Sequence, residues 1–151
     1  MKRIRIYVDT SVIGGCLDDE FADESRALLT MARRGEAVLL LSDLLLEELA
    51  KAPPAVRSVL ESLPERCFET VVASEESREL RDAYLAAQIA SEASKNDAHH
   101  VALATVSRAD IIVSWNFKHI VHYEKIRAFN AVNLLQGYNT MEIRSPLEVV
   151  P

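Results

Sequence analysis

Three acidic residues stand at positions where a carboxylate could take part in chemistry. Asp9 directly follows residues 3–8, whose alternating apolar side chains predict a strand. Glu48 lies three and four residues after two leucines of a short predicted helix, so it faces the side of that helix that is buried. Asp97 stands in the first turn of another predicted helix. Carboxylates in such places hold divalent cations or act as general bases.

The first two acids also have structural explanations. Asp9 could serve as a helix cap or a turn residue, and its position alone favours neither role. Glu47 is followed by Lys51 four residues later, which predicts an ion pair on the surface. Glu48 lies nearer the apolar face, where an unpaired carboxylate would be costly and a cation is one possible partner. Glu48 is therefore a better candidate than Glu47.

The third acid can be explained by helix capping as well. Ser94 precedes Asp97 by three residues, and this spacing fits a variant of the capping box. However, Asp97 shares a helix face with His100, Val101 and Ala104, and that face otherwise packs inward. A charged residue at the start of a buried stripe favours a function.

Several kinds of site are excluded because their sequence motifs are absent from the chain. The sequence contains no GxxxxGK[ST] or GxGxxG phosphate loop and no GxSxG nucleophile motif. Phosphatases that phosphorylate an aspartate after the first strand carry Asp-x-Asp, whereas Ser11 stands at the second position here. The four histidines fit no familiar zinc spacing, and we expect two of them to flank a helix: His119 and His122.

Strands and helices are predicted to alternate along the chain, which indicates an α/β fold with a mainly parallel sheet. In such sheets, ligands bind beyond the carboxyl ends of the strands, where Asp9 and Asn116 fall. The glycines at 14 and 15 predict a loop after the first strand. We expect strands at 3–8, 37–42, 68–73, 110–115 and 141–146, and helices at 24–35, 44–51, 55–63, 75–93, 97–108 and 119–135.

The composition is that of an ordinary globular domain. The chain has 151 residues, of which 49% are hydrophobic and 26% charged, so we expect one domain over residues 1–151. No apolar run approaches the ~18 residues of a membrane span, and the start does not resemble a signal peptide. Cys16 and Cys67 are therefore expected to be reduced thiols in the cytoplasm. A net charge of −6 argues against broad, sequence-independent nucleic-acid binding but not against a nuclease with an acidic metal site.

Four stretches of the sequence, taken together, resemble the PIN domain, a nuclease family that includes VapC-type toxins. The resemblance implies a three-layer sandwich in which a mainly parallel sheet of about four or five strands lies between helices. It also implies metal-dependent hydrolysis of RNA. The stretches are YVDTSVIGG at 7–15, LSDLLLEELAK at 41–51, SKNDAHHVALATVSRADIIVSWNFKHI at 94–120 and LLQGYNTMEIRSP at 134–146.

The resemblance assigns roles to residues of this chain. Asp9, Glu48 and Asp97 fall on the family acids and would be the catalytic, metal-holding residues. Ser114 falls on the family's hydroxyl residue, and Ser11 would support the site. Asn116 stands where the family has a fourth acid. Its amide oxygen can still ligate a metal or a bound water, but it cannot attract a second cation as a carboxylate would.

The same resemblance implies cofactors and partners. Mg²⁺ or Mn²⁺ suits an all-oxygen site, and the substrate would be RNA. VapC-type toxins pair with an antitoxin and often form homodimers; alanines at 83, 86, 87 and 90 could pack on a second copy or within the chain. Two alternatives stay open. One is a catalytically weakened PIN-like module that binds RNA or a protein partner, and the other is a phosphatase of small substrates.

Overall fold

The computed structural model describes residues 2–151 and is built around a single five-stranded sheet. The strands are β1 (Ile4–Val8), β2 (Ala37–Ser42), β3 (Phe68–Val71), β4 (Ile111–Val113) and β5 (Glu142–Arg144). They lie in the order β3-β2-β1-β4-β5, and every neighbouring pair is parallel. The predicted α/β fold with a parallel sheet is confirmed.

The strand order reverses direction at β1. The chain moves outward from β1 to β2 and β3, and then returns to the other side of β1 with β4 and β5. The helices that follow β1 and β4 therefore leave in opposite directions, and a crevice opens beyond the carboxyl ends of these two strands. Asp9 and Ser114 each come directly after one of the two strands, so the topology alone puts both at this crevice.

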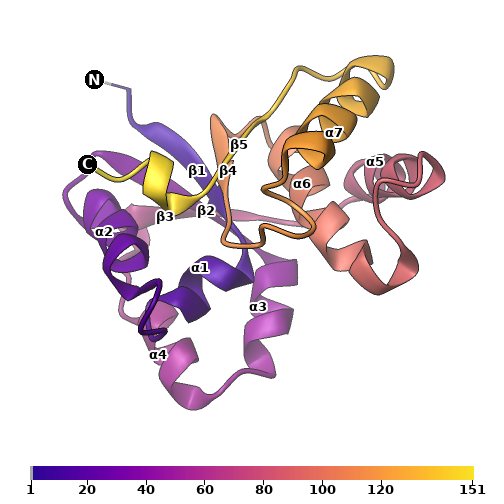
Figure 1. Cartoon of the computed structure of the whole chain (residues 1–151). Coiled ribbons are helices and arrows are strands. Elements are labelled where there is room, and N and C mark those ends of the chain that lie inside the picture. The colour runs from indigo at the N-terminus through magenta and orange to yellow at the C-terminus, as the bar shows by residue number, and fades with distance from the viewer. Residues whose placement is uncertain (1) are drawn as a thin grey trace.

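Helices cover both faces of the sheet (Figure 1). Alternate residues of β1 serve the two layers: Ile6 and Val8 belong to the core shared with α1, α2, α3 and α4, whereas Tyr7 belongs to the core shared with α5, α6 and α7. β2 is buried along its whole length, as expected for the interior of a parallel sheet. The helices are α1 (Thr10–Gly15), α2 (Ala22–Arg33), α3 (Asp43–Ala50), α4 (Pro54–Glu61), α5 (Glu75–Ala86), α6 (Lys95–Val106) and α7 (Tyr123–Leu135), and short 3₁₀ turns span Glu65–Cys67, Glu92–Ser94 and Pro146–Glu148.

The structure corrects the expected helix at 75–93. α5 ends at Ala86, and Gln88 takes a left-handed conformation with φ of 62°. The amide of Ile89 donates to the carbonyl of Tyr84, and that of Gln88 donates to Leu85, which is the Schellman pattern of helix termination. Burial of Ile89 against the core favours this turn even though the left-handed residue is not glycine.

Two smaller expectations were also wrong. The predicted loop at residues 14 and 15 is the end of α1, a short helix that starts directly after Asp9. The predicted helix 119–135 begins only at Tyr123, because residues 119–122 form a turn and His122 takes the extended N-cap conformation. The first change shortens the path from β1 to the helix that follows it, whereas the second lengthens the connection from β4 to α7.

Within residues 2–151, no helix combines the length and the apolar character that crossing a membrane requires. Cys16 and Cys67 are both free and buried, as expected of reduced thiols.

Candidate active site

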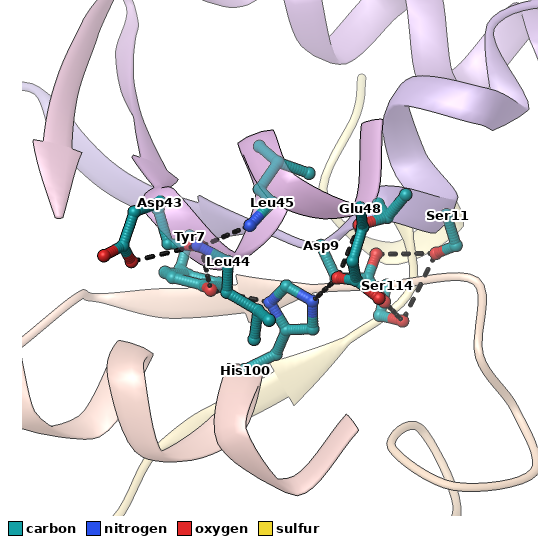
Figure 2. A network of polar contacts seen from close by, with 11 residues as sticks. Tyr7, Asp9, Ser11, Asp43, Leu44, Leu45, Glu48, His100 and Ser114 are labelled. Atoms are coloured by element: carbon teal, nitrogen blue, oxygen red, sulfur yellow. Dashed lines mark hydrogen bonds and ion pairs between the residues drawn. The ribbon is translucent and has the colours of Figure 1, made fainter. Parts of the chain in front are cut away.

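Asp9 is a buried carboxylate that does not cap the helix it precedes. It occupies the N-cap position of α1, yet its side chain makes no capping hydrogen bond and is only 3% exposed. Instead, Ser11 Oγ donates to Asp9 Oδ1 at 2.6 Å and Ser114 Oγ donates to Asp9 Oδ2 at 2.5 Å. Figure 2 shows the carboxylate between the two serines. The hydroxyls join the ends of β1 and β4 through this acid.

The surroundings of Asp9 oppose its negative charge. Burial raises the pKa of the Asp9 carboxyl, and the nearby charge of Asp97 raises it further. The charge of His100 and the hydrogen bonds from Ser11 and Ser114 act in the opposite direction without cancelling the rise. An ionised Asp9 is therefore a group that a bound cation would stabilise.

Glu48 projects from α3 toward the same region and is held by two side chains. Thr10 Oγ1 donates to Glu48 Oε1 at 2.9 Å, and His100 Nε2 lies 2.5 Å from the same oxygen (Figure 2). Because an ionised carboxylate only accepts hydrogen bonds, Nε2 carries the proton of this contact. On the far side of the ring, His100 Nδ1 lies 2.7 Å from the hydroxyl of Tyr7, which in turn donates to Ser42 Oγ at 2.8 Å.

This network keeps Glu48 ionised. Partial burial is the largest single influence on the Glu48 pKa and would raise it. The hydrogen bond and charge of His100, together with Thr10 and Lys51, outweigh that effect, so the pKa of Glu48 is lowered. Glu47, one residue earlier, is exposed. The sequence-based choice of Glu48 over Glu47 agrees with these orientations.

Asp97 enters the region from the first turn of α6. Ser94 does not cap this helix, since its hydroxyl pairs with Ser91 in a separate capping box, and the predicted Ser94–Asp97 box was wrong. Burial raises the pKa of the Asp97 carboxyl, while His119 and a hydrogen bond from Asn116 lower it in part. Asp97 therefore has polar neighbours of its own and is not needed to start the helix.

Asn116 connects Asp97 to the serine pair. Its backbone amide donates to Ser114 Oγ at 2.9 Å, and its side-chain oxygen accepts from the backbone amide of His119 at 2.9 Å. With the oxygen so engaged, the amino group is the part that remains for Asp97. Asn116 thus supports Asp97 as a donor, and its amide oxygen closes the turn before α7.

The three carboxylates of this region are the type of ligand that a hard divalent cation prefers. The side chains of Asp9, Asp97 and Glu48 are close enough that the charge of Asp97 raises the pKa of Asp9 and that of Glu48 raises the pKa of Asp97. Oxygen ligands of this type suit Mg²⁺ or Mn²⁺. In the described part of the chain, however, no three His, Cys, Asp or Glu side chains gather tightly enough to enclose an ion, and Glu48 Oε1 is bonded to His100.

Most of this chain matches the model of a known protein family. A family model described as the PIN domain matches residues 5–118, which is well over half of the chain. The protein belongs to the PIN-domain family. PIN domains are generally nucleases, and the matched residues include every predicted site residue from Asp9 to Asn116.

The fold of this PIN domain also matches a solved structure. The crystal structure of VapBC2 from Rickettsia felis, bound to a DNA fragment from their promoter, superposes with a TM-score of 0.61. The match covers 94% of this chain and 98% of that chain at 16% sequence identity, so it concerns the fold alone. No curated protein matches the sequence significantly.

Sequence reasoning missed three residues that shape this PIN domain's site: Thr10, His100 and Tyr7. The signal for His100 was available, because it lies three residues after Asp97 on a face that packs inward. Nothing in the sequence indicated that its partner would be Glu48, because that contact joins residues 52 positions apart.

Proposed function

We propose that this PIN domain is a metal-dependent endoribonuclease that hydrolyses phosphodiester bonds of RNA. The observation that carries the proposal is the buried carboxylate of Asp9 at the point where the strand order reverses, with Asp97 and Glu48 within electrostatic reach. Membership of a family of nucleases and the arrangement of acids support the same reaction class.

The cofactor of the proposed reaction is Mg²⁺ or Mn²⁺, held by Asp9 and Asp97, with Glu48 as a direct or water-mediated ligand. Such an ion lowers the pKa of a water molecule and neutralises charge that develops on the phosphate. The raised pKa of Asp97 suits it to accept a hydrogen bond from the attacking water and to orient it. This assignment gives each acid the role that its surroundings in the fold favour.

The polar residues around the acids would keep the site in order. Ser11 and Ser114 fix the orientation of the Asp9 carboxylate by donating to one oxygen each. Asn116 holds Asp97, and His100 holds Glu48 in the ionised form. The proposed catalytic acids are thus supported by neighbours that limit their rotation.

The partners of the proposed nuclease follow from its relatives. We propose a cytoplasmic toxin of a type II toxin–antitoxin pair, bound in the resting state by a small antitoxin protein. A homodimer is part of the same proposal. Of the four alanines considered for it, Ala83 and Ala90 pack against the chain's own core, which leaves Ala86 and Ala87 exposed for a second copy.

The proposal is tested by cleavage of single-stranded RNA with purified protein in Mn²⁺, Mg²⁺ or EDTA. Asp9→Asn keeps the size of the side chain but removes its charge, so the rate should fall by at least roughly 100-fold. Asp82→Asn makes the same chemical change on the exposed surface of α5 and should leave the rate unchanged. EDTA should abolish cleavage by the unaltered protein.

Other outcomes would identify the alternatives. Cleavage that persists in Asp9→Asn would contradict the assignment of the site. An absence of cleavage with either metal would favour a module that binds RNA or protein without cutting, and hydrolysis of a generic phosphate monoester instead of RNA would favour a phosphatase.

A further inference from the structure

A hollow with aromatic walls lies directly beside the candidate active site. It has a volume of about 440 Å³ and shares two lining residues with the site, Ser11 and Asn116. The hydroxyl of Ser11 binds Asp9, and the side chain of Asn116 supports Asp97. The hollow and the carboxylates are therefore continuous. Its remaining lining comes from Gly14, Gly15, Asp18, Phe21 and Trp115.

The indole of Trp115 forms a fixed wall of this hollow. Its Nε1 donates to Ser25 Oγ at 2.7 Å, and Phe21 stacks on it with 4.2 Å between ring centroids. Its backbone amide donates to Ser11 Oγ at 2.9 Å. A Cβ on Gly15 would lie 2.6 Å from Ser25 Oγ and 2.9 Å from Trp115 Nε1, so the glycine is what allows the indole to approach.

A third aromatic ring extends this wall to the surface. Phe117 packs edge-on against Trp115 with 6.2 Å between ring centroids, yet 46% of the residue is exposed. It directly follows Asn116, and Lys118, the next residue, is exposed as well. An exposed apolar ring and an exposed cation are thus consecutive in the chain next to Asn116.

We propose that this hollow, the Trp115 subsite, binds an unpaired nucleobase of the RNA substrate, stacked on the exposed ring of Phe117 at its rim, with the largely buried Trp115 behind that ring; the inference rests on the proposed nuclease function. A strand whose phosphate lies over Asp9 carries its neighbouring base into the adjoining hollow. Every base has a flat π-face, and stacking on aromatic side chains is the usual way in which proteins hold single strands.

The charges around the subsite favour a base over a phosphate within it. Asp18 is one of the lining residues, and its negative charge would repel a phosphate, whereas base amino groups can donate to a carboxylate. One Asp18 oxygen accepts from the amide of Glu20 at 2.9 Å, which leaves acceptor capacity on the carboxylate. Lys118 lies outside the hollow, where the backbone of the strand would pass.

The chain contains one tryptophan, so its fluorescence reports on this subsite directly. The probe is a cleavage-resistant 2′-O-methyl oligoribonucleotide, compared with an abasic oligonucleotide of the same length, in EDTA and at low salt. We expect the oligonucleotide with bases to quench Trp115 in a saturable manner. We expect the abasic one to bind at least roughly tenfold more weakly, because it cannot stack.

Two substitutions test the subsite without touching the acids. Phe117→Ala removes the exposed ring, and Gly14→Leu fills the hollow from α1, where an added Cβ meets no atom within 4 Å. Each should weaken binding of the base-bearing probe by roughly tenfold and raise the KM for RNA cleavage more than it lowers kcat. Leu147→Ala, at an exposed leucine elsewhere, is the control and should bind normally.

The outcomes separate this inference from the proposed nuclease function. Equal affinity for the two probes, or normal binding by both Phe117→Ala and Gly14→Leu, would overturn the subsite even if RNA is cleaved. Either result would indicate that a protein partner, not a nucleobase, covers this surface. Base-dependent binding that both variants weaken would support the subsite even if no RNA is cleaved. If the protein neither cleaves RNA nor distinguishes the probes, both proposals fall.

Discussion

At the scale of single residues, the candidate site is built from carboxylates in unfavourable surroundings. Burial raises the pKa of both Asp9 and Asp97, and the two charges repel each other. Because a group with a raised pKa favours the folded state only when it is protonated, ionisation of these acids destabilises the fold above their pKa values. A cation between them would remove that cost. In the proposed nuclease, the fold thus gives up stability at acids that are placed to bind a cation.

We expect residue 116 to determine how strongly the proposed site attracts a cation. Replacing Asn116 by Asp adds a fourth carboxylate and removes the side-chain donor that lowers the pKa of Asp97. In EDTA, Asn116→Asp should lower the Tm by roughly 2–4 °C, the shift that about 1 kcal/mol gives in a chain of this size. In Mn²⁺, its Tm should rise more than that of the unaltered protein, because the site binds the ion more tightly.

The measurement is thermal unfolding of each variant with and without Mn²⁺. Asn139→Asp, at an exposed position, makes the same change in net charge and serves as the control. If Asn116→Asp and Asn139→Asp respond equally to Mn²⁺, position 116 does not contribute to an ion site.

The sequence identified residues of the candidate site more reliably than it identified the contacts between them. Asp9 could be selected because a strand pattern ends on it, and Glu48 because leucines mark the buried side of its helix. The role of the Ser11 and Ser114 hydroxyls as donors to one carboxylate depends on β1 and β4 lying next to each other. Strand order is set by long-range packing, which periodicity does not encode.

At the scale of elements, the helices α5 and α6 pack together around a buried histidine. His99 Nε2 lies 3.2 Å from Ser77 Oγ, and the residue is 6% exposed. Burial lowers the pKa of His99 to about 4, and the positive charge of Arg81 contributes to the decrease. In the unfolded chain, an ordinary histidine has a pKa near 6.5. The folded protein therefore resists protonation of His99 over this range.

This difference predicts a loss of stability in acid. Between about pH 6.5 and 4 the unfolded state binds a proton at His99 that the folded state does not, so the free energy of unfolding decreases as the pH falls. His99 should account for about 3 kcal/mol of that decrease, and the loss should be complete below about pH 4.

Urea unfolding at several pH values checks this, with His99→Gln compared with the unaltered protein so that the contributions of the acids cancel. His122→Gln, at an exposed histidine, is the control and should keep the original pH dependence. A profile for His99→Gln that parallels that of the unaltered protein would show that His99 does not carry the effect.

Most element types were predictable; apart from α1, which was expected as a loop, the errors fell at the ends of helices. Residues 75–93 contain no glycine or proline, so nothing in that stretch marks the end of α5 at Ala86. The turn at Gln88 forms because Ile89 is buried once the chain reverses, which is a tertiary effect. α6 ends in the same way, with Arg108 in the left-handed conformation. By contrast, α2 ends shortly before Gly35, a stop signal that can be recognised in the sequence.

At the scale of the whole molecule, the parallel sheet brings together acids from three distant parts of the chain. Asp9, Glu48 and Asp97 follow or lie near the carboxyl ends of strands whose order reverses at β1. The molecule carries a net charge of −6, so general attraction does not hold an RNA strand. Binding would instead depend on the ion at the acids, the stacking wall beside them and local cations such as Lys118.

The most direct test of this account is a calorimetric titration of metal-free protein with Mn²⁺ at pH 7.5. We expect saturable binding to the unaltered protein and to Asp82→Asn, and an affinity lower by more than about tenfold for Asp9→Asn, which loses the central ligand. If Mn²⁺ does not bind, or binds Asp9→Asn as tightly as the unaltered protein, the carboxylates at this edge of the sheet are not a metal site.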